Sequence, residues 1–110
     1  MTELKSLCRS LSLRLDSPVV LRAGSRSAWY CQPKNALQSQ YIPTPQVHAI
    51  DTNGACDAHS GVLCAGIFQG LPIEEALVLA NCAGALSTTQ RGPATCPSEE
   101  AIRKAASSLQ

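Results

Sequence analysis

The spacing of apolar positions changes twice along the chain, dividing it into a helix, a group of short strands and a helical remainder. Over residues 3–15, apolar side chains recur every three or four positions, which predicts an amphipathic helix. These apolar positions are Leu4, Leu7, Cys8, Leu11 and Leu15. We expect the helix to end near Pro18, because the residue before a proline disfavours helical dihedral angles.

Three short strands are predicted next. Residues 19–21 are uniformly apolar, which is typical of a strand buried in a parallel sheet. After a turn, residues 28–31 are expected to return as the second strand of a hairpin, and a third strand is expected near residues 39–42. Pro43 and Pro45 then keep the chain extended as far as residues 46–50. His48 is interpreted there as an ordinary strand residue.

From residue 57 onward the pattern is helical. Residues 57–70 are small and apolar on nearly all sides, which predicts a helix buried within a domain. Gly70 and Pro72 separate it from a second helix over residues 73–88, since glycine favours a helix end and proline a helix start. Ser98 is a candidate cap for a final helix, with acidic residues in its first turn.

Composition excludes several classes of protein. The 110 residues suit one domain or a piece of one, and 45% hydrophobic with 15% charged residues is typical of a globular chain. A net charge of +1 gives no reason to expect nucleic acid or an acidic membrane as a partner. The longest apolar run, residues 62–68, is far shorter than the ~20 residues that span a bilayer. No signal peptide is evident, so a cytoplasmic location is expected.

Six cysteines are many for this length. No C-x-x-C pair and no Cys/His cluster has the spacing of a zinc site. Three of the cysteines lie among small residues in predicted helices, where cysteine behaves as a small buried hydrophobe. We therefore expect reduced, structural cysteines rather than disulfides.

The segment from Asp51 to Gly61 carries the strongest indication of chemistry. It combines a glycine, two small residues and an acid at the start of a predicted helix. Peptide N–H groups at such a turn point toward a negative ligand, with a carboxylate beside them. Taken alone, the pattern favours the simpler interpretation that Asp57 caps a helix after a tight turn.

The run D-T-N-G-A-C-D, from Asp51 to Asp57, closely resembles the D-T-x-G-A-G-D signature of the PfkB, or ribokinase-like, carbohydrate kinases. Similar blocks flank it in family order at residues 19–29, 41–47, 69–77, 80–86 and 89–93, so the resemblance runs from about Ser17 to the end. It implies an α/β fold, a partial ribokinase-like three-layer sandwich with a small mixed sheet flanked by helices. It assigns residues 1–110 to the C-terminal portion of a kinase domain, which carries the nucleotide-binding part and the catalytic base.

The resemblance also implies roles for individual residues. Asp57 aligns with the catalytic base that activates the acceptor hydroxyl, and the backbone of Gly54, Ala55 and Cys56 aligns with the anion hole. Gly24 and Ser25 align with contacts to the phosphates of ATP, and Asn81 lies at a position beside the adenine. A monovalent cation site, usually for potassium, is implied at Asp51, Asn53, Ser87, Gln90 and Gly92.

Three positions depart from the family pattern. Cys56 replaces the last glycine of the signature, where its side chain either crowds a phosphate or points away. We expect impaired anion binding rather than a new thiol function. His59 replaces a phenylalanine, and a packed or capping histidine is favoured over a substrate contact. Cys96 falls where some members place a hydroxyl ligand of the cation, and a thiol is a poor ligand for a hard ion.

The resemblance covers only the C-terminal part of a family member. The lid with its sugar-binding acid and the N-x-x-E segment associated with Mg²⁺ have no counterpart in the sequence. A partial sheet would leave an open edge and an apolar face, which favour self-association or pairing with a missing N-terminal half.

The expected function is ATP-dependent phosphorylation of a sugar or nucleoside hydroxyl, with Mg²⁺ and in many members potassium. We expect this phosphotransferase activity to be weak or absent in the chain alone. The alternative is a non-catalytic remnant or interaction module that retains nucleotide binding.

Overall fold

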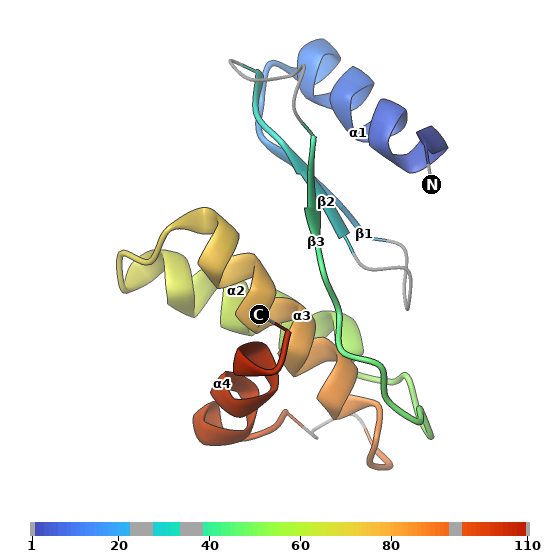
Figure 1. Cartoon of the computed structure of the whole chain (residues 1–110), viewed down its shortest axis with the longest axis vertical. Helices are drawn as coiled ribbons and strands as arrows, with labels where there is room; N and C mark the ends of the chain where they lie inside the picture. The colour runs from blue at the N-terminus through green and yellow to red at the C-terminus, as the bar shows by residue number, and fades with distance from the viewer. Residues whose placement is uncertain (1, 23–27, 34–38, 93–95, 110) are drawn as a thin grey trace. The chain divides into compact units, whose positions relative to one another are not determined.

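A computed structural model describes residues 2–22, 28–33, 39–92 and 96–109. The chain forms two compact units, Met1–Ile42 and Pro43–Gln110, and each unit is described here by itself. Figure 1 shows that the first unit holds one helix and the strands, whereas the second holds the other helices.

The first unit consists of α1 (Thr2–Leu15), β1 (Val19–Arg22), β2 (Ala28–Cys31) and β3 (Gln40–Ile42). All four elements were predicted, and the expected hairpin of β1 and β2 is confirmed, whereas the expected parallel pairing of a mixed sheet is not found among the described strands. The three described strands lie in the order β1-β2-β3, and both pairings are antiparallel. Residues 23–27 alone separate β1 from β2, and parallel strands need a crossover of about a dozen residues. Over the described residues the sheet is therefore antiparallel rather than mixed.

Helix α1 packs against one face of this sheet through sulfur and apolar side chains. Cys8 and Cys31 are buried together, with Val19, Leu21 and Trp29 around them. The Cys8 thiol lies 3.5 Å from the carbonyl oxygen of Trp29, and burial, followed by the nearby Cys31, raises the pKa of the Cys8 thiol. These contacts connect the helix to β1 and β2.

The second unit consists of an extended segment followed by α2 (Ala55–Phe68), α3 (Ile73–Ser87) and α4 (Glu99–Ser107). The prediction that His48 lies in a strand is wrong, because residues 43–49 have no regular structure and His48 is exposed. The segment is anchored at its end instead. The backbone N–H groups of Ile50 and Asp51 both donate to the carbonyl oxygen of Thr88, at 2.7 and 3.0 Å.

The ends of the helices follow the local sequence signals. Helix α2 ends in a Schellman motif: Gly70 has a φ of 86°, its N–H donates to Ile67, and the N–H of Leu71 donates to the carbonyl oxygen of Gly66. The predicted cap of α4 is confirmed, since the Ser98 hydroxyl accepts a hydrogen bond from the N–H of Ala101 at 3.2 Å.

The core of the second unit lies between α3 and its two neighbouring helices. Its buried members are Ala58, Leu79, Cys82, Ala83, Ile102 and Ala106. Nine of the 15 residues of α3 are buried, whereas α2 buries only Ala58, His59 and Gly66. The prediction that α2 is a helix buried within a domain is therefore wrong for the structure of these residues. The second unit holds three helices and no strand among its described residues, so only one side of α2 is covered.

The cysteines also differ in burial. All six are thiols, as expected, but only Cys8, Cys31 and Cys82 are buried, whereas Cys56, Cys64 and Cys96 are exposed. Within the described part of the chain, no helix has the length and apolar character needed to cross a membrane.

Candidate active site

The Asp51–Asp57 segment forms a tight turn that leads directly into α2. Gly54 caps the helix with φ 83° and ψ −5°, a left-handed conformation that side chains other than glycine adopt at a cost. The Ala55 N–H donates to the carbonyl oxygen of Thr52 at 3.3 Å, and the Ala58 N–H donates to that of Gly54 at 2.9 Å. The glycine thus sets the direction in which the helix starts.

Two backbone donors remain at this helix start. Among the described residues, no group accepts a hydrogen bond from the N–H of Cys56 or Asp57, and no side chain caps the helix. The first N–H groups of a helix carry the positive end of its dipole and bind anions. The Asp57 carboxylate lies in this same first turn and is exposed. The turn can therefore hold an anion next to an accessible base.

Cys56 is exposed as well. Whether its side chain crowds a bound phosphate or points away from it stays a prediction.

Asp51 connects the turn to a distant part of the chain. One carboxylate oxygen accepts the Asn53 N–H at 2.9 Å, and the other accepts the Gly92 N–H at 3.0 Å. The backbone hydrogen bond from Gly92, followed by the one from Asn53, lowers the pKa of the Asp51 carboxyl below its ordinary value. Asp51 is therefore held as an anion between two loops that are far apart in the sequence.

This arrangement brings together several residues of the implied cation site. Asp51, Asn53 and Gly92 are linked directly by hydrogen bonds. Ser87 is buried at the end of α3, and Gln90 is exposed in the turn that follows. Sequence reasoning missed Thr88, whose carbonyl oxygen fastens residues 50 and 51 to this turn. No sequence signal could have indicated it, because the contact uses only backbone atoms.

His59 is a packed histidine, as favoured from the sequence. It is 3% exposed, and its Nε2 lies 3.0 Å from the Asn81 side-chain oxygen. The Asn81 amide nitrogen in turn donates to the carbonyl oxygen of Pro43 at 3.1 Å. A carbonyl only accepts hydrogen bonds, so Asn81 presents its oxygen to His59, and Nε2 of His59 carries the proton. The implied position of Asn81 beside an adenine stays a prediction, as does any role of Gly24 and Ser25, which lie outside the described residues.

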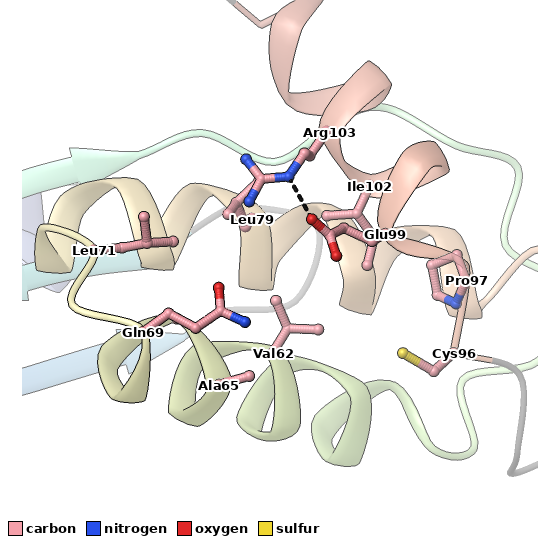
Figure 2. Close-up of a pocket in the computed structure, with 11 residues that line it drawn as sticks. Val62, Ala65, Gln69, Leu71, Leu79, Cys96, Pro97, Glu99, Ile102 and Arg103 are labelled. Atoms are coloured by element: carbon pink, nitrogen blue, oxygen red, sulfur yellow. Dashed lines mark hydrogen bonds and ion pairs between the residues drawn. The ribbon is translucent and has the colours of Figure 1, made fainter.

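A separate cavity of about 220 Å³ lies between α2, α3 and α4 (Figure 2). Its wall includes Val62, Leu71 and Leu79, with the Glu99–Arg103 ion pair at one side. Cys96, at a position where some family members have a ligand of the cation, lies in its wall, whereas Asp51, Asp57 and Asn81 do not line it. No group of three or more His, Cys, Asp and Glu side chains that could hold a metal ion occurs in the part of the chain that the structure describes.

Comparison with known proteins identifies the family. The sequence model of the pfkB family of carbohydrate kinases matches residues 1–101. The chain belongs to this family. The match begins earlier than the resemblance near Ser17 suggested, so α1 belongs to the family region as well.

Individual relatives agree with this assignment. The uncharacterized sugar kinase YegV of Escherichia coli K12 is 29% identical over 100 residues, which are 91% of this chain and 30% of that protein. A putative ribokinase from Agrobacterium tumefaciens superimposes with a TM-score of 0.88 at 24% identity, covering 96% of this chain and 35% of that one. A putative ribokinase II from E. coli, solved with ATP and Mg²⁺, has a TM-score of 0.74 at 27% identity, covering 84% and 29%.

The fold is thus confirmed as part of the ribokinase-like α/β fold. The chain spans about 30% of the length of the curated relative that it matches.

Proposed function

We propose that this chain provides the catalytic base and the phosphate-binding turn of a carbohydrate kinase that transfers a phosphoryl group from ATP to a sugar or nucleoside hydroxyl. One observation carries the proposal: the N–H groups of Cys56 and Asp57 have no acceptor among the described residues and lie beside the Asp57 carboxylate. This turn lies within a chain that belongs to the pfkB family of carbohydrate kinases. Phosphoryl transfer depends on such positioning and charge stabilisation more than on covalent chemistry of the protein.

In the proposed reaction, Asp57 accepts the proton of the acceptor hydroxyl as its oxygen attacks the γ-phosphorus of ATP. A new oxygen–phosphorus bond forms, the bond to the β-phosphate oxygen breaks, and ADP leaves. The two N–H groups, together with the helix dipole of α2, stabilise the negative charge on the transferring group. Gly54 keeps these donors in place because its left-handed conformation sets the start of the helix.

ATP and metal ions are included in this proposal because of the similarity to other members of the family. The E. coli putative ribokinase II was solved with ATP and Mg²⁺, and we extend this pair of ligands to the present chain, where Mg²⁺ would neutralise phosphate charge. Contacts of Gly24, Ser25 and Asn81 with ATP are part of the proposal. A monovalent cation at Asp51, Asn53, Ser87, Gln90 and Gly92 is another part, supported by the lowered pKa that keeps Asp51 negative.

The proposal is tested by measuring ADP release from ATP with a panel of sugars and nucleosides. We compare the wild-type chain with Asp57→Asn, which keeps the shape of the side chain and removes the base. Acceptor-dependent ADP release is expected to fall by about 10²–10⁴-fold. Glu100→Gln is the matched control, because Glu100 is also an exposed acid in the first turn of a helix. Equal release from wild type and Asp57→Asn would overturn Asp57 as the base.

A second candidate is a non-catalytic module that binds nucleotide. It is favoured by Cys56, which stands in the proposed anion-binding turn where the family signature has a glycine. ATP binding at equilibrium separates the two functions. Binding without acceptor-dependent turnover, unchanged in Asp57→Asn, would support the module.

A further inference from the structure

Helix α2 has the composition of a buried helix but is covered on one side only. No Asp, Glu, Lys or Arg occurs between Asp57 and Glu74, although the outer face of a surface helix normally carries charges. Only Ala58, His59 and Gly66 are buried in it. Ile67 is 52% exposed and Phe68 is 92% exposed. A large aromatic side chain in water, on a helix without compensating charges, indicates a surface that another polypeptide covers.

The exposed residues of α2 lie on one face together with the proposed base. Asp57, Gly61, Cys64 and Phe68 follow one another at intervals of four, three and four residues, which places them along one stripe of the helix. All four are exposed, and Ile67 lies next to this stripe. We call these five residues the open face of α2. A polypeptide that covers its apolar end therefore also reaches the neighbourhood of the Asp57 carboxylate.

The similarity to a solved structure indicates which polypeptide covers the open face of α2. The Agrobacterium ribokinase superimposes on 96% of this chain with a TM-score of 0.88, yet this region is only 35% of that structure. The chain thus has the fold of one region of a larger ribokinase-like domain. Beyond Asp57 the open face of α2 is apolar and carries no charge, so it fits the interior of such a domain better than it fits water.

We propose that the open face of α2 docks the part of a ribokinase-like kinase domain that these 110 residues do not span. Docking buries Cys64, Ile67 and Phe68 and brings the acceptor-binding part of the domain to Asp57. The docking itself stands on the exposed apolar face, and only its consequence for catalysis rests on the proposed function. Docking would thus combine the proposed base and phosphate-binding turn of this chain with an acceptor-binding part, and together they would form a complete kinase site.

The test supplies this part of the domain as a separate polypeptide. The chain is co-expressed with the part of E. coli YegV that lies outside the 100 matched residues, and the affinity of the purified pair is measured. We then compare Phe68→Asp with Gln69→Asp. Both introduce one negative charge at adjacent exposed positions, but Gln69 lines the cavity on the other side of α2 (Figure 2). Phe68→Asp is expected to weaken binding by about 30-fold or more, as at a central interface residue, and Gln69→Asp by much less.

Native cysteines give a second measurement within the same chain. Cys64 lies on the open face, whereas Cys96 is exposed in the segment before α4. Alkylation by iodoacetamide, followed at each cysteine by mass spectrometry, is expected to slow by about tenfold or more at Cys64 when the partner is bound. At Cys96 the rate is expected to stay the same.

The outcomes are distinct. No binding, or binding that Phe68→Asp and Gln69→Asp weaken equally, overturns the docking. If the chain alone forms a dimer that Phe68→Asp dissociates, the occupant is a second copy, and the proposal is wrong. If the pair binds and Cys64 is protected but acceptor-dependent ADP release is absent, the docking stands and the proposed function fails.

Discussion

Replacing Gly66 by alanine is expected to destabilise the second unit, although alanine is the better helix former. A Cβ at this position would lie 2.9 Å from the Cβ of Ala76, which is fully buried at the start of α3. Carbon atoms in favourable contact are about 3.5–4.0 Å apart, so α2 and α3 would have to separate by a large part of 1 Å. Ala76 has no flexible side chain that could move aside. The strain therefore falls on the two helix backbones.

The size of the effect follows from two opposing contributions. Overpacking a well-packed contact costs about 1–3 kcal/mol, whereas replacing glycine by alanine within a helix gains about 0.5–1 kcal/mol. We expect Gly66→Ala to lower the free energy of unfolding by about 0.5–2 kcal/mol. Gly61, in the same helix, has nothing within 4 Å of its added Cβ. Gly61→Ala should therefore raise the free energy of unfolding by about 0.5–1 kcal/mol.

Urea unfolding followed by far-UV circular dichroism measures this difference. Circular dichroism is the suitable signal because Trp29, the single tryptophan, lies in the first unit, whereas both glycines lie in the second. The unfolding midpoints of the two variants should differ by about 1 M urea, from slopes of about 1–3 kcal/mol per M. In the double variant Gly66→Ala/Ala76→Gly, one methyl group is moved across the contact, and the two effects should not be additive. A midpoint for Gly66→Ala at or above that of Gly61→Ala would show that the close helix contact does not exist.

Three further predictions concern the site and the thiols. Gly54→Ala should cost about 1–2 kcal/mol of stability, measured by urea unfolding, because φ is 83° there, and an unchanged midpoint would contradict this. The pKa of the Asp51 carboxyl is lowered, so the stability that this group contributes is complete above the ordinary carboxyl pKa and is lost as the pH falls through the lower folded-state pKa. In Asp51→Asn, the free energy of unfolding, measured as a function of pH, should therefore fall less steeply at acid pH than in the wild type. The same acid dependence in both proteins would refute this. Burial raises the pKa of Cys82 to about 11, so at neutral pH iodoacetamide should modify Cys64 while Cys82 stays unmodified until the protein unfolds; equal rates would refute this.

The proposed site and the open face of α2 are related, because Asp57 belongs to both. The turn has two backbone donors and a carboxylate, but Asp57 is exposed, so the described residues of the second unit do not shield it from water. Water exclusion strengthens every electrostatic interaction of a phosphoryl-transfer site. The docking experiment and the Asp57→Asn comparison therefore test two parts of the same proposed site.

Local sequence determined the boundaries of the elements and the candidate turn. Proline, glycine and serine signals act within one or two turns of chain, so the Ser98 cap and the Gly70 helix end could be read directly. The signature from Asp51 to Asp57 predicted the tight turn at the start of α2 for the same reason, since its glycine acts on adjacent backbone groups.

Tertiary structure decided which of these elements are covered and which loops meet. Cys64 and Cys82 have similar small neighbours in sequence, yet one is exposed and the other buried, because the burial of a helix face depends on the elements packed against it. The bond from Gly92 to Asp51 joins residues 41 positions apart, and no local pattern encodes it. The sequence by itself thus determined the family and the position of the candidate turn. Only the three-dimensional arrangement showed that α2, with the composition of an interior helix, has a face that its own unit leaves open.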